Sequence, residues 1–160
     1  CKEFYMFNFE SVAFGHNHVI DELTGAKSAN LFDEYLERAI AVRRRNGGAL
    51  FIVTVKVLAP TKKLKNGSPA YVEQIRKFEE SLLKTNEIIS RNIRAGDFYT
   101  RMAVDGFYIL IKGESREEAN LTERYKRLFA DRSLYQVNKF QLIGDKSSTE
   151  WLNEIDEVYF

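Results

Sequence analysis

The segment 94–111 constrains the fold most, because a strong turn signal separates two short stretches of strand-forming residues. Asp105-Gly106 is a dipeptide that favours a tight two-residue turn between antiparallel strands. The stretches on either side, 98–104 and 107–112, contain aromatic and β-branched residues, which pack well on a pleated surface. The sequence therefore predicts a β-hairpin with a type I′ turn at Asp105-Gly106.

Helix signals surround this hairpin. Apolar residues at helical spacing predict helices over 29–45, from Ser68-Pro69 to about residue 94, and over 115–129. Ser28 and Ser68 are suitable N-caps, Pro69 suits a first helical turn, and Gly47-Gly48 ends the first helix. Further strands are predicted over 49–57 and 137–143, with a loop over 58–69 and a final helical turn over 151–155. This order predicts an α+β fold, in which helices flank a central, mostly antiparallel sheet of about five strands.

Composition narrows the class of protein. The 160 residues suit one domain, which we place at 20–160, after an aromatic N-terminal segment at 1–19. The net charge of +1 gives no overall field that would attract nucleic acid, and no apolar run is long enough to cross a membrane. The single cysteine excludes an internal disulfide and fits a reducing compartment. We expect a cytoplasmic domain excised from a longer chain, either a soluble protein or the cytoplasmic part of a membrane-anchored one.

Several motifs, in their order along the chain, resemble the GGDEF domain of diguanylate cyclases. The residues that carry the resemblance are Asp21-x-Leu23-Thr24-Gly25 with Phe32 in the helix that follows, the strand Leu50 to Val57, the pair Arg94-x-x-Asp97, and Arg101 at the start of the turn motif. The resemblance covers about residues 20–145. It implies a GGDEF-type, nucleotidyl-cyclase-like fold. It also implies an ancestry among enzymes that condense two GTP molecules into cyclic di-GMP with divalent metal ions.

The residues that this chemistry needs are largely replaced. The turn that reads Gly-Gly-Asp/Glu-Glu-Phe in active members reads Ala103-Val104-Asp105-Gly106-Phe107 here. The first core strand ends with Lys56 where the family has an aspartate, and a lysine repels a metal ion rather than binding it. We therefore expect a degenerate domain that is not an enzyme. It would have no catalytic residues, no metal site and no cofactor, and the turn 103–107 would be the remnant of an active site.

One ligand site of the family has matching residues. Arg94-x-x-Asp97 stands where many members carry an inhibitory product site, and Arg124 resembles a further arginine of that site. A guanidinium can fork onto a guanine or a phosphate, and a carboxylate can accept hydrogen bonds from the guanine edge. Cyclic di-GMP is therefore a candidate ligand of Arg94, Asp97 and Arg124. A purely structural role is the alternative, because a cation is favoured at a helix C-terminus and Asp97 suits a loop cap.

A second interpretation needs no nucleotide. A domain that has lost catalysis and kept its fold can still form a homodimer, or regulate an attached or partner signalling domain. A third interpretation is metal-independent nucleotide binding by Lys62, Lys63 and Lys65, although a lysine-rich loop is usually only solvated. His16 and His18 are too few for a metal site and are expected to be ordinary loop residues.

Overall fold

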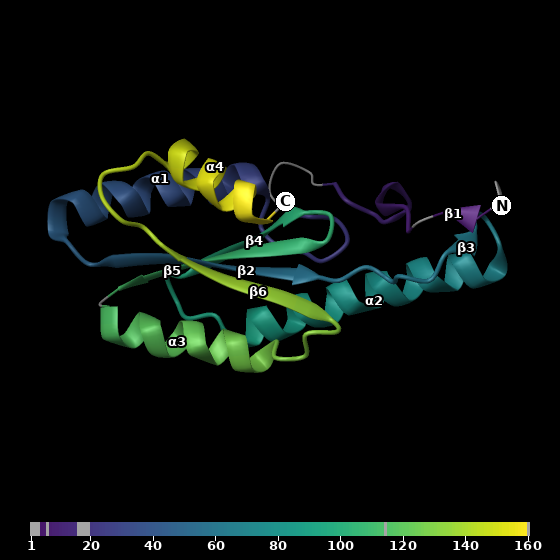
Figure 1. The fold of residues 1–160 in the computed structure, drawn as a ribbon. Helices are drawn as coiled ribbons and strands as arrows, with labels where there is room; N and C mark the ends of the chain where they lie inside the picture. Colours follow the sequence, from purple (N-terminus) through teal and green to yellow (C-terminus); the bar gives the residue numbers. More distant parts are fainter. Residues whose placement is uncertain (1–3, 6, 16–19, 114, 160) are drawn as a thin grey trace.

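A four-stranded antiparallel sheet lies between two layers of helices in the computed structural model, which describes residues 4–5, 7–15, 20–113 and 115–159 (Figure 1). The strand order is β4-β5-β2-β6, and the strands are β2 (Ala49–Val57), β4 (Phe98–Ala103), β5 (Gly106–Gly113) and β6 (Tyr135–Gln141). The helices are α1 (Ala29–Asn46), α2 (Pro69–Asn92), α3 (Ser115–Leu128) and α4 (Ser148–Tyr159). The predicted α+β class is confirmed.

Local capping explains where the first two long helices begin and end. The Ser28 side chain accepts a hydrogen bond from the backbone N–H of Leu31 at 3.2 Å, and Ser68 accepts one from Tyr71 at 3.2 Å. Gly47 ends α1 with a positive φ of 74°, a conformation that costs glycine little. The predicted caps of both helices are therefore confirmed.

Strand β2 is the centre of the sheet, because it pairs with β5 on one side and with β6 on the other. Its side chains alternate between two cores, as the two-residue period of a strand requires. Leu50 and Ile52 face the layer of α1 and α4, whereas Phe51 and Val53 face the layer of α2 and α3. Lys56 is the one residue of β2 that is not buried.

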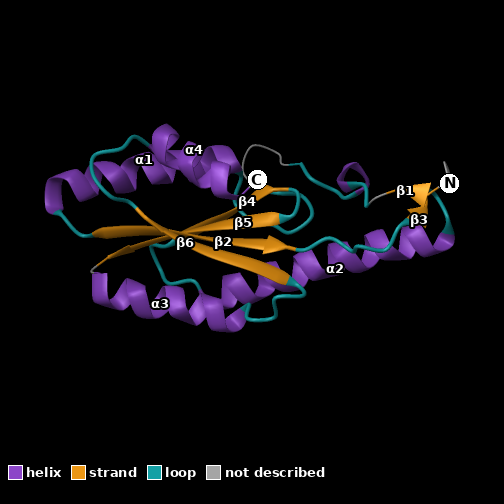
Figure 2. Ribbon diagram, viewed as in Figure 1, coloured by secondary structure: helices purple, strands orange, loops and turns teal. Residues whose placement is uncertain are grey.

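The structure differs from the predictions at several elements. The main sheet has four strands rather than five, and a separate two-stranded ribbon joins β1 (Phe4–Tyr5) to β3 (Leu64–Lys65) within the predicted loop (Figure 2). Strand β6 begins and ends two residues earlier than predicted. Helix α4 is much longer than one turn, because Trp151, Ile155 and Tyr159 recur every four residues and bury one continuous face.

The aromatic N-terminal segment packs on this domain. Phe7 and Phe9 make edge-to-face contacts with Phe78 of α2, at ring-centroid distances of 4.9 and 5.8 Å. After the short 3-10 helix η1 (Phe9–Ser11), Val12 is buried in the core shared by α2 and α3. No helix within the described residues is long and apolar enough to cross a bilayer.

Candidate functional site

The hairpin turn is shifted by one residue from its predicted position. Ala103 pairs with Gly106, so the two residues between the strands are Val104 and Asp105 rather than Asp105 and Gly106. Gly106 does not have the positive φ that a type I′ turn would need, and it is the first residue of β5. The backbone carbonyl of Asp105 accepts a hydrogen bond from the N–H of Val57 at 2.7 Å, which holds the turn against the end of β2.

Packing against α4 explains the glycine. A Cβ atom on Gly106 would lie 1.6 Å from the hydroxyl oxygen of Tyr159. That hydroxyl contacts Asp105 Oδ1 at 3.3 Å, and burial together with the nearby Asp105 raises the pKa of Tyr159. Lys56, which pairs with Gly106, has its Nζ 5.0 Å from the centre of the Tyr159 ring. The one carboxylate that remains in the turn therefore contacts a phenol, and an ammonium group lies beside the ring of that phenol.

A buried arginine connects this turn to the N-terminal motif. Arg101 is 2 % exposed, and its Nη1 lies 3.1 Å from Asp21 Oδ1. Its Nη2 donates to the carbonyl of Val104 at 2.7 Å, and Nη1 also donates to the carbonyl of Ala13 at 2.7 Å. Burial lowers the pKa of Arg101, and Asp21 opposes that effect. The Asp21-x-Leu23-Thr24-Gly25 motif thus fixes the turn through Arg101, a link that the sequence motifs did not reveal by themselves.

Arg94 and Asp97 lie together, as a common site requires. Arg94 Nε donates to Asp97 Oδ2 at 2.9 Å. Both residues also bind the backbone of Lys112 in β5: Arg94 Nη2 donates to its carbonyl at 3.0 Å, and its N–H donates to Asp97 Oδ1 at 3.3 Å. The Asp97 side chain is 2 % exposed and that of Arg94 is 37 % exposed. The pair therefore has a buried carboxylate and a guanidinium that partly faces solvent.

Arg124 lies on the exposed face of α3, next to the buried Tyr125. Tyr125 is buried, and its hydroxyl has no hydrogen-bond partner among the described residues. Burial and the negative charge of Asp97 raise the pKa of Tyr125 to about 12, whereas Arg124 and Arg94 lower it. The charges of all three predicted ligand-binding residues therefore influence the pKa of this phenol. Tyr125 was not predicted as part of the site, because a tyrosine on the apolar face of an amphipathic helix is usually a core residue.

The other candidates lie elsewhere or cannot be described. Lys62, Lys63 and Lys65 lie in and beside β3, next to the first turns of α2 and away from the main sheet (Figure 1). His16 and His18 lie outside the described residues. Within the described part of the chain, no three His, Cys, Asp or Glu residues gather in a way that would hold a metal ion. The absence of a metal site and of catalysis remains a prediction.

Solved structures with a similar fold are GGDEF domains. A sensory box/GGDEF family protein from Caulobacter crescentus superposes with a TM-score of 0.66 and 17% identity over 86% of this chain and 93% of that one. The GGDEF domain of DgcB from Caulobacter crescentus, in complex with c-di-GMP, superposes with a TM-score of 0.65. It is 14% identical over 89% of this chain and 88% of that one. The diguanylate cyclase SiaD from Pseudomonas aeruginosa, in complex with its activator SiaC, superposes with a TM-score of 0.64. It is 14% identical over 86% of this chain and 55% of that one.

Sequence comparison adds no further relative. No protein-family model matches the chain, and no curated protein matches it in sequence. At identities of 14–17% the structural likeness establishes the fold, and that fold is the one expected from the motifs.

Proposed function

We propose that this domain, which has the GGDEF-type fold, is a catalytically inactive regulatory domain that binds cyclic di-GMP through Arg94 and Asp97. The observation that carries the proposal is the 2.9 Å contact between Arg94 Nε and Asp97 Oδ2, fixed on both sides by the backbone of Lys112. Two side chains that are already oriented lose little conformational entropy when a ligand binds.

The chemistry of the pair suits a guanine nucleotide. A carboxylate accepts hydrogen bonds from the N1 and N2 donors of guanine, and a guanidinium binds a phosphate or the opposite edge of the base. Arg124, on the exposed face of α3, supplies a second positive charge, which acts on the same Tyr125 hydroxyl as the charges of the pair. The solved structure of the DgcB GGDEF domain contains c-di-GMP, which makes this nucleotide the first ligand to test.

The hairpin turn supports the loss of catalysis. The ammonium group of Lys56 lies beside Tyr159, on the strand end where active members carry an acid, and a magnesium ion prefers carboxylate oxygens. Val104 places a β-branched side chain in the turn, where active members have glycine. Asp105 is the one acidic residue of the turn, and it is already in contact with Tyr159.

Titration calorimetry with cyclic di-GMP tests the receptor. We expect micromolar binding to the wild-type protein, and a loss of about tenfold or more in Arg94→Ala and Asp97→Asn, since one charge-assisted hydrogen bond contributes about 1.5–3 kcal/mol. Arg91→Ala is the matched control, because Arg91 lies on an exposed surface of α2 and pairs with Glu87. Circular dichroism verifies that each variant is folded. Equal binding by Arg94→Ala and Arg91→Ala would contradict the assignment of this site.

A separate assay tests inactivity. We expect no cyclic di-GMP when the purified protein is incubated with GTP and magnesium. Product that disappears in Asp105→Ala would show that the single turn carboxylate is enough for catalysis, and the inactive assignment would then be wrong.

One observation favours the second interpretation, an interaction module without a nucleotide. A groove of about 560 Å³ runs along α2, and its wall includes Leu23, Ile75, Val72, which is 59% exposed, and Leu83, which is 43% exposed. Exposed apolar side chains of this kind are typical of protein-binding surfaces. If light scattering shows a wild-type dimer that Leu83→Asp dissociates, and cyclic di-GMP does not bind, the interaction module is the better description.

A further inference from the structure

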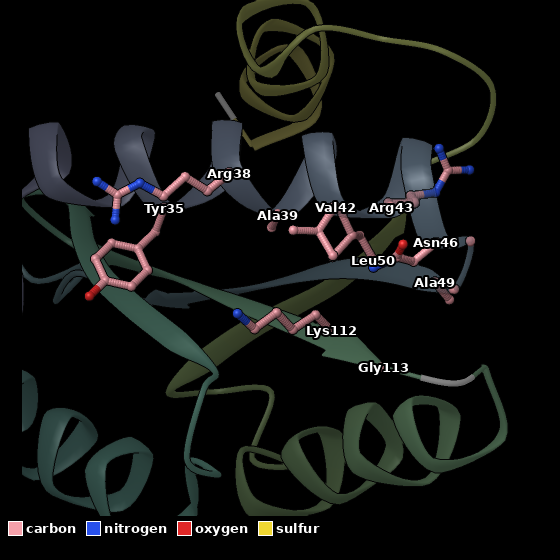
Figure 3. A pocket seen from close by; sticks show the side chains of 12 residues that line it. Tyr35, Arg38, Ala39, Val42, Arg43, Asn46, Ala49, Leu50, Lys112 and Gly113 are labelled. Carbon is pink, nitrogen blue, oxygen red and sulfur yellow. The ribbon is translucent and has the colours of Figure 1, made fainter.

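A pocket between Arg38 of α1 and Lys112 of β5 lies beside the proposed cyclic di-GMP site (Figure 3). The backbone of Lys112 binds both Arg94 and Asp97. Its side-chain Cε atom lies 3.8 Å from the position that a Cβ on Gly96 would take, so this pocket belongs to the surroundings of that site. The groove along α2 is a different surface, because it shares no described residue with the pocket.

Hydrogen bonds join the two walls of the α2 groove. One wall is a flank of α2, and the other includes Ser11 and Leu23 from the N-terminal part of the chain. The hydroxyl oxygens of Ser11 and Tyr71 form a hydrogen bond of 3.2 Å. Asn86 Nδ2 donates to the carbonyl of Thr24, next to Leu23 in the sequence, at 2.9 Å. The walls are therefore fixed before a partner binds, which reduces the entropy lost on binding.

The floor and one edge of this groove are apolar. Tyr71 and Ile75 form part of the lining and are only 4% and 9% exposed, whereas Val72 and Leu83 are largely accessible to solvent. Val72 and Leu83 lie about 16 Å apart along the axis of α2, or about three helical turns. A helix bound in a groove uses apolar anchors at i, i+3 or i+4, and i+7, which span about two turns. The groove is therefore long enough for a partner helix.

The charged residues along the groove are mostly acidic. Glu79 and Glu80 line it together with Arg76. The guanidinium of Arg76 forms ion pairs with Glu80 and with Glu73, whose Oε2 lies 2.9 Å from the Arg76 Nε. Glu79 forms no ion pair among the described residues, although its charge opposes the burial that lowers the pKa of Arg101. Three carboxylates and one guanidinium leave this surface with a net negative charge.

This charge selects among the possible occupants. A second copy of the chain would bring two acidic surfaces together, and like charges across an interface are costly. Nucleic acid and an anionic membrane surface carry the same unfavourable sign. The described residues that line the groove include no lysine, so its acidic character is not offset there. A segment with apolar and basic side chains is complementary to both features of the groove.

We propose that the α2 groove binds a basic amphipathic helix of a partner protein. Apolar side chains of that helix lie between Val72 and Leu83, and its lysine or arginine side chains contact Glu79 and Glu80. The proposal deepens the second interpretation, the interaction module, by naming the chemistry of its partner. It does not depend on the binding of cyclic di-GMP at the other site.

The test is a titration of the purified protein into a fluorescently labelled synthetic helix, followed by fluorescence anisotropy. The probe has about 18 residues, or about five turns, with leucine on one face and lysine on the other. We expect the wild-type protein to bind it. Val72→Ser with Leu83→Ser in one chain should weaken binding about tenfold or more, because two apolar contacts are lost. Glu79→Gln with Glu80→Gln should weaken it about fivefold, and added salt should act in the same direction.

Matched controls separate the groove from general attraction. Glu34→Gln with Glu37→Gln removes the same charge from exposed positions of α1, outside the groove, and should leave binding unchanged. A probe with the same residues in an order that is not amphipathic should bind weakly to every protein. Arg94→Ala should bind the helix as the wild type does, so a failure here and a failure of the cyclic di-GMP site give different patterns. Circular dichroism verifies that each variant is folded.

Three results would overturn the proposal. One is the absence of binding between the basic probe and the wild-type protein. Another is binding that is equal in the wild type and in both groove variants. The third is a wild-type dimer in light scattering that Val72→Ser with Leu83→Ser dissociates, which would make a second copy of this chain the occupant.

Discussion

Tyr159 and Gly106 lie so close together that no side chain fits at position 106 while Tyr159 keeps its position. A Cβ there would lie 1.6 Å from the Tyr159 hydroxyl and 2.5 Å from its Cζ atom. The last turn of α4 therefore covers the start of β5, next to the turn. An acidic side chain at position 106 therefore cannot coexist with the observed packing.

We predict that Gly106→Ala destabilises the domain by about 1–3 kcal/mol, the usual cost of overpacking a core. The measurement is urea unfolding followed by circular dichroism. Gly15→Ala is the control: none of the described residues lies within 4 Å of a Cβ at that position, so its stability should be nearly that of wild type. Tyr159→Ala should cost less in the Gly106→Ala background than in wild type, because residues in contact are not additive. If Gly106→Ala and Gly15→Ala lower the free energy of unfolding by the same amount, the contact with Tyr159 does not constrain position 106.

The buried ion pair between Arg101 and Asp21 should matter far more than an exposed one. We predict that Asp21→Asn costs about 3–5 kcal/mol, because it leaves a buried guanidinium without its carboxylate. Asp145→Asn breaks the pair with Arg44, whose side chains are 50 % and 78 % exposed, and should change stability by less than about 1 kcal/mol. Both values come from denaturant unfolding. If Asp21→Asn and Asp145→Asn lower the free energy of unfolding equally, the buried pair does not stabilise the turn.

Two buried tyrosines should respond in opposite ways to loss of the hydroxyl. Tyr108 donates to Asp156 Oδ1 at 2.6 Å, whereas the Tyr125 hydroxyl finds no partner in the part of the chain that the structure describes. We predict that Tyr108→Phe destabilises the domain by about 1–3 kcal/mol, and that Tyr125→Phe is neutral or stabilising, because an unsatisfied buried group is removed. Thermal and urea unfolding of the two variants provide the comparison. A large loss in Tyr125→Phe would reveal a hydrogen bond to that hydroxyl in solution.

Alkaline pH should weaken the fold. Burial and the nearby Asp97 raise the pKa of Tyr125 to about 12, above the ordinary tyrosine value of about 10. The folded protein therefore holds this proton more tightly than the unfolded chain does. Its contribution to stability is complete below about pH 10 and is lost as the pH rises toward 12, at up to about 1.4 kcal/mol per pH unit.

Unfolding in urea at several alkaline pH values measures this loss. Tyr125→Phe should make it shallower, because one group with a raised pKa is gone. A slope that is the same in wild type and in Tyr125→Phe would mean that Tyr125 ionises normally in the folded protein.

Elements that depend on local signals could be predicted from the amino-acid sequence. Ser28 and Ser68 fixed the starts of α1 and α2 because an N-cap acts on backbone groups only two or three residues away. The residues of β2 were predicted without error, since a run of apolar, β-branched residues next to Gly47-Gly48 has few other structures open to it. The hairpin and the α+β class followed for the same reason.

Features that join residues far apart in the chain depend on how the helices and strands pack together. The turn lies one residue earlier than predicted, and Tyr159, at the end of α4, takes the space beside Gly106. Arg94 and Asp97 were foreseen, but Tyr125 and the Lys112 backbone complete their surroundings from α3 and β5. The pocket between Arg38 and Lys112 joins a helix to a strand that has no sequence pattern in common with it. Such sites depend on packing between elements. Secondary-structure propensity depends only on residues close in the sequence, so it does not predict which distant side chains will be in contact.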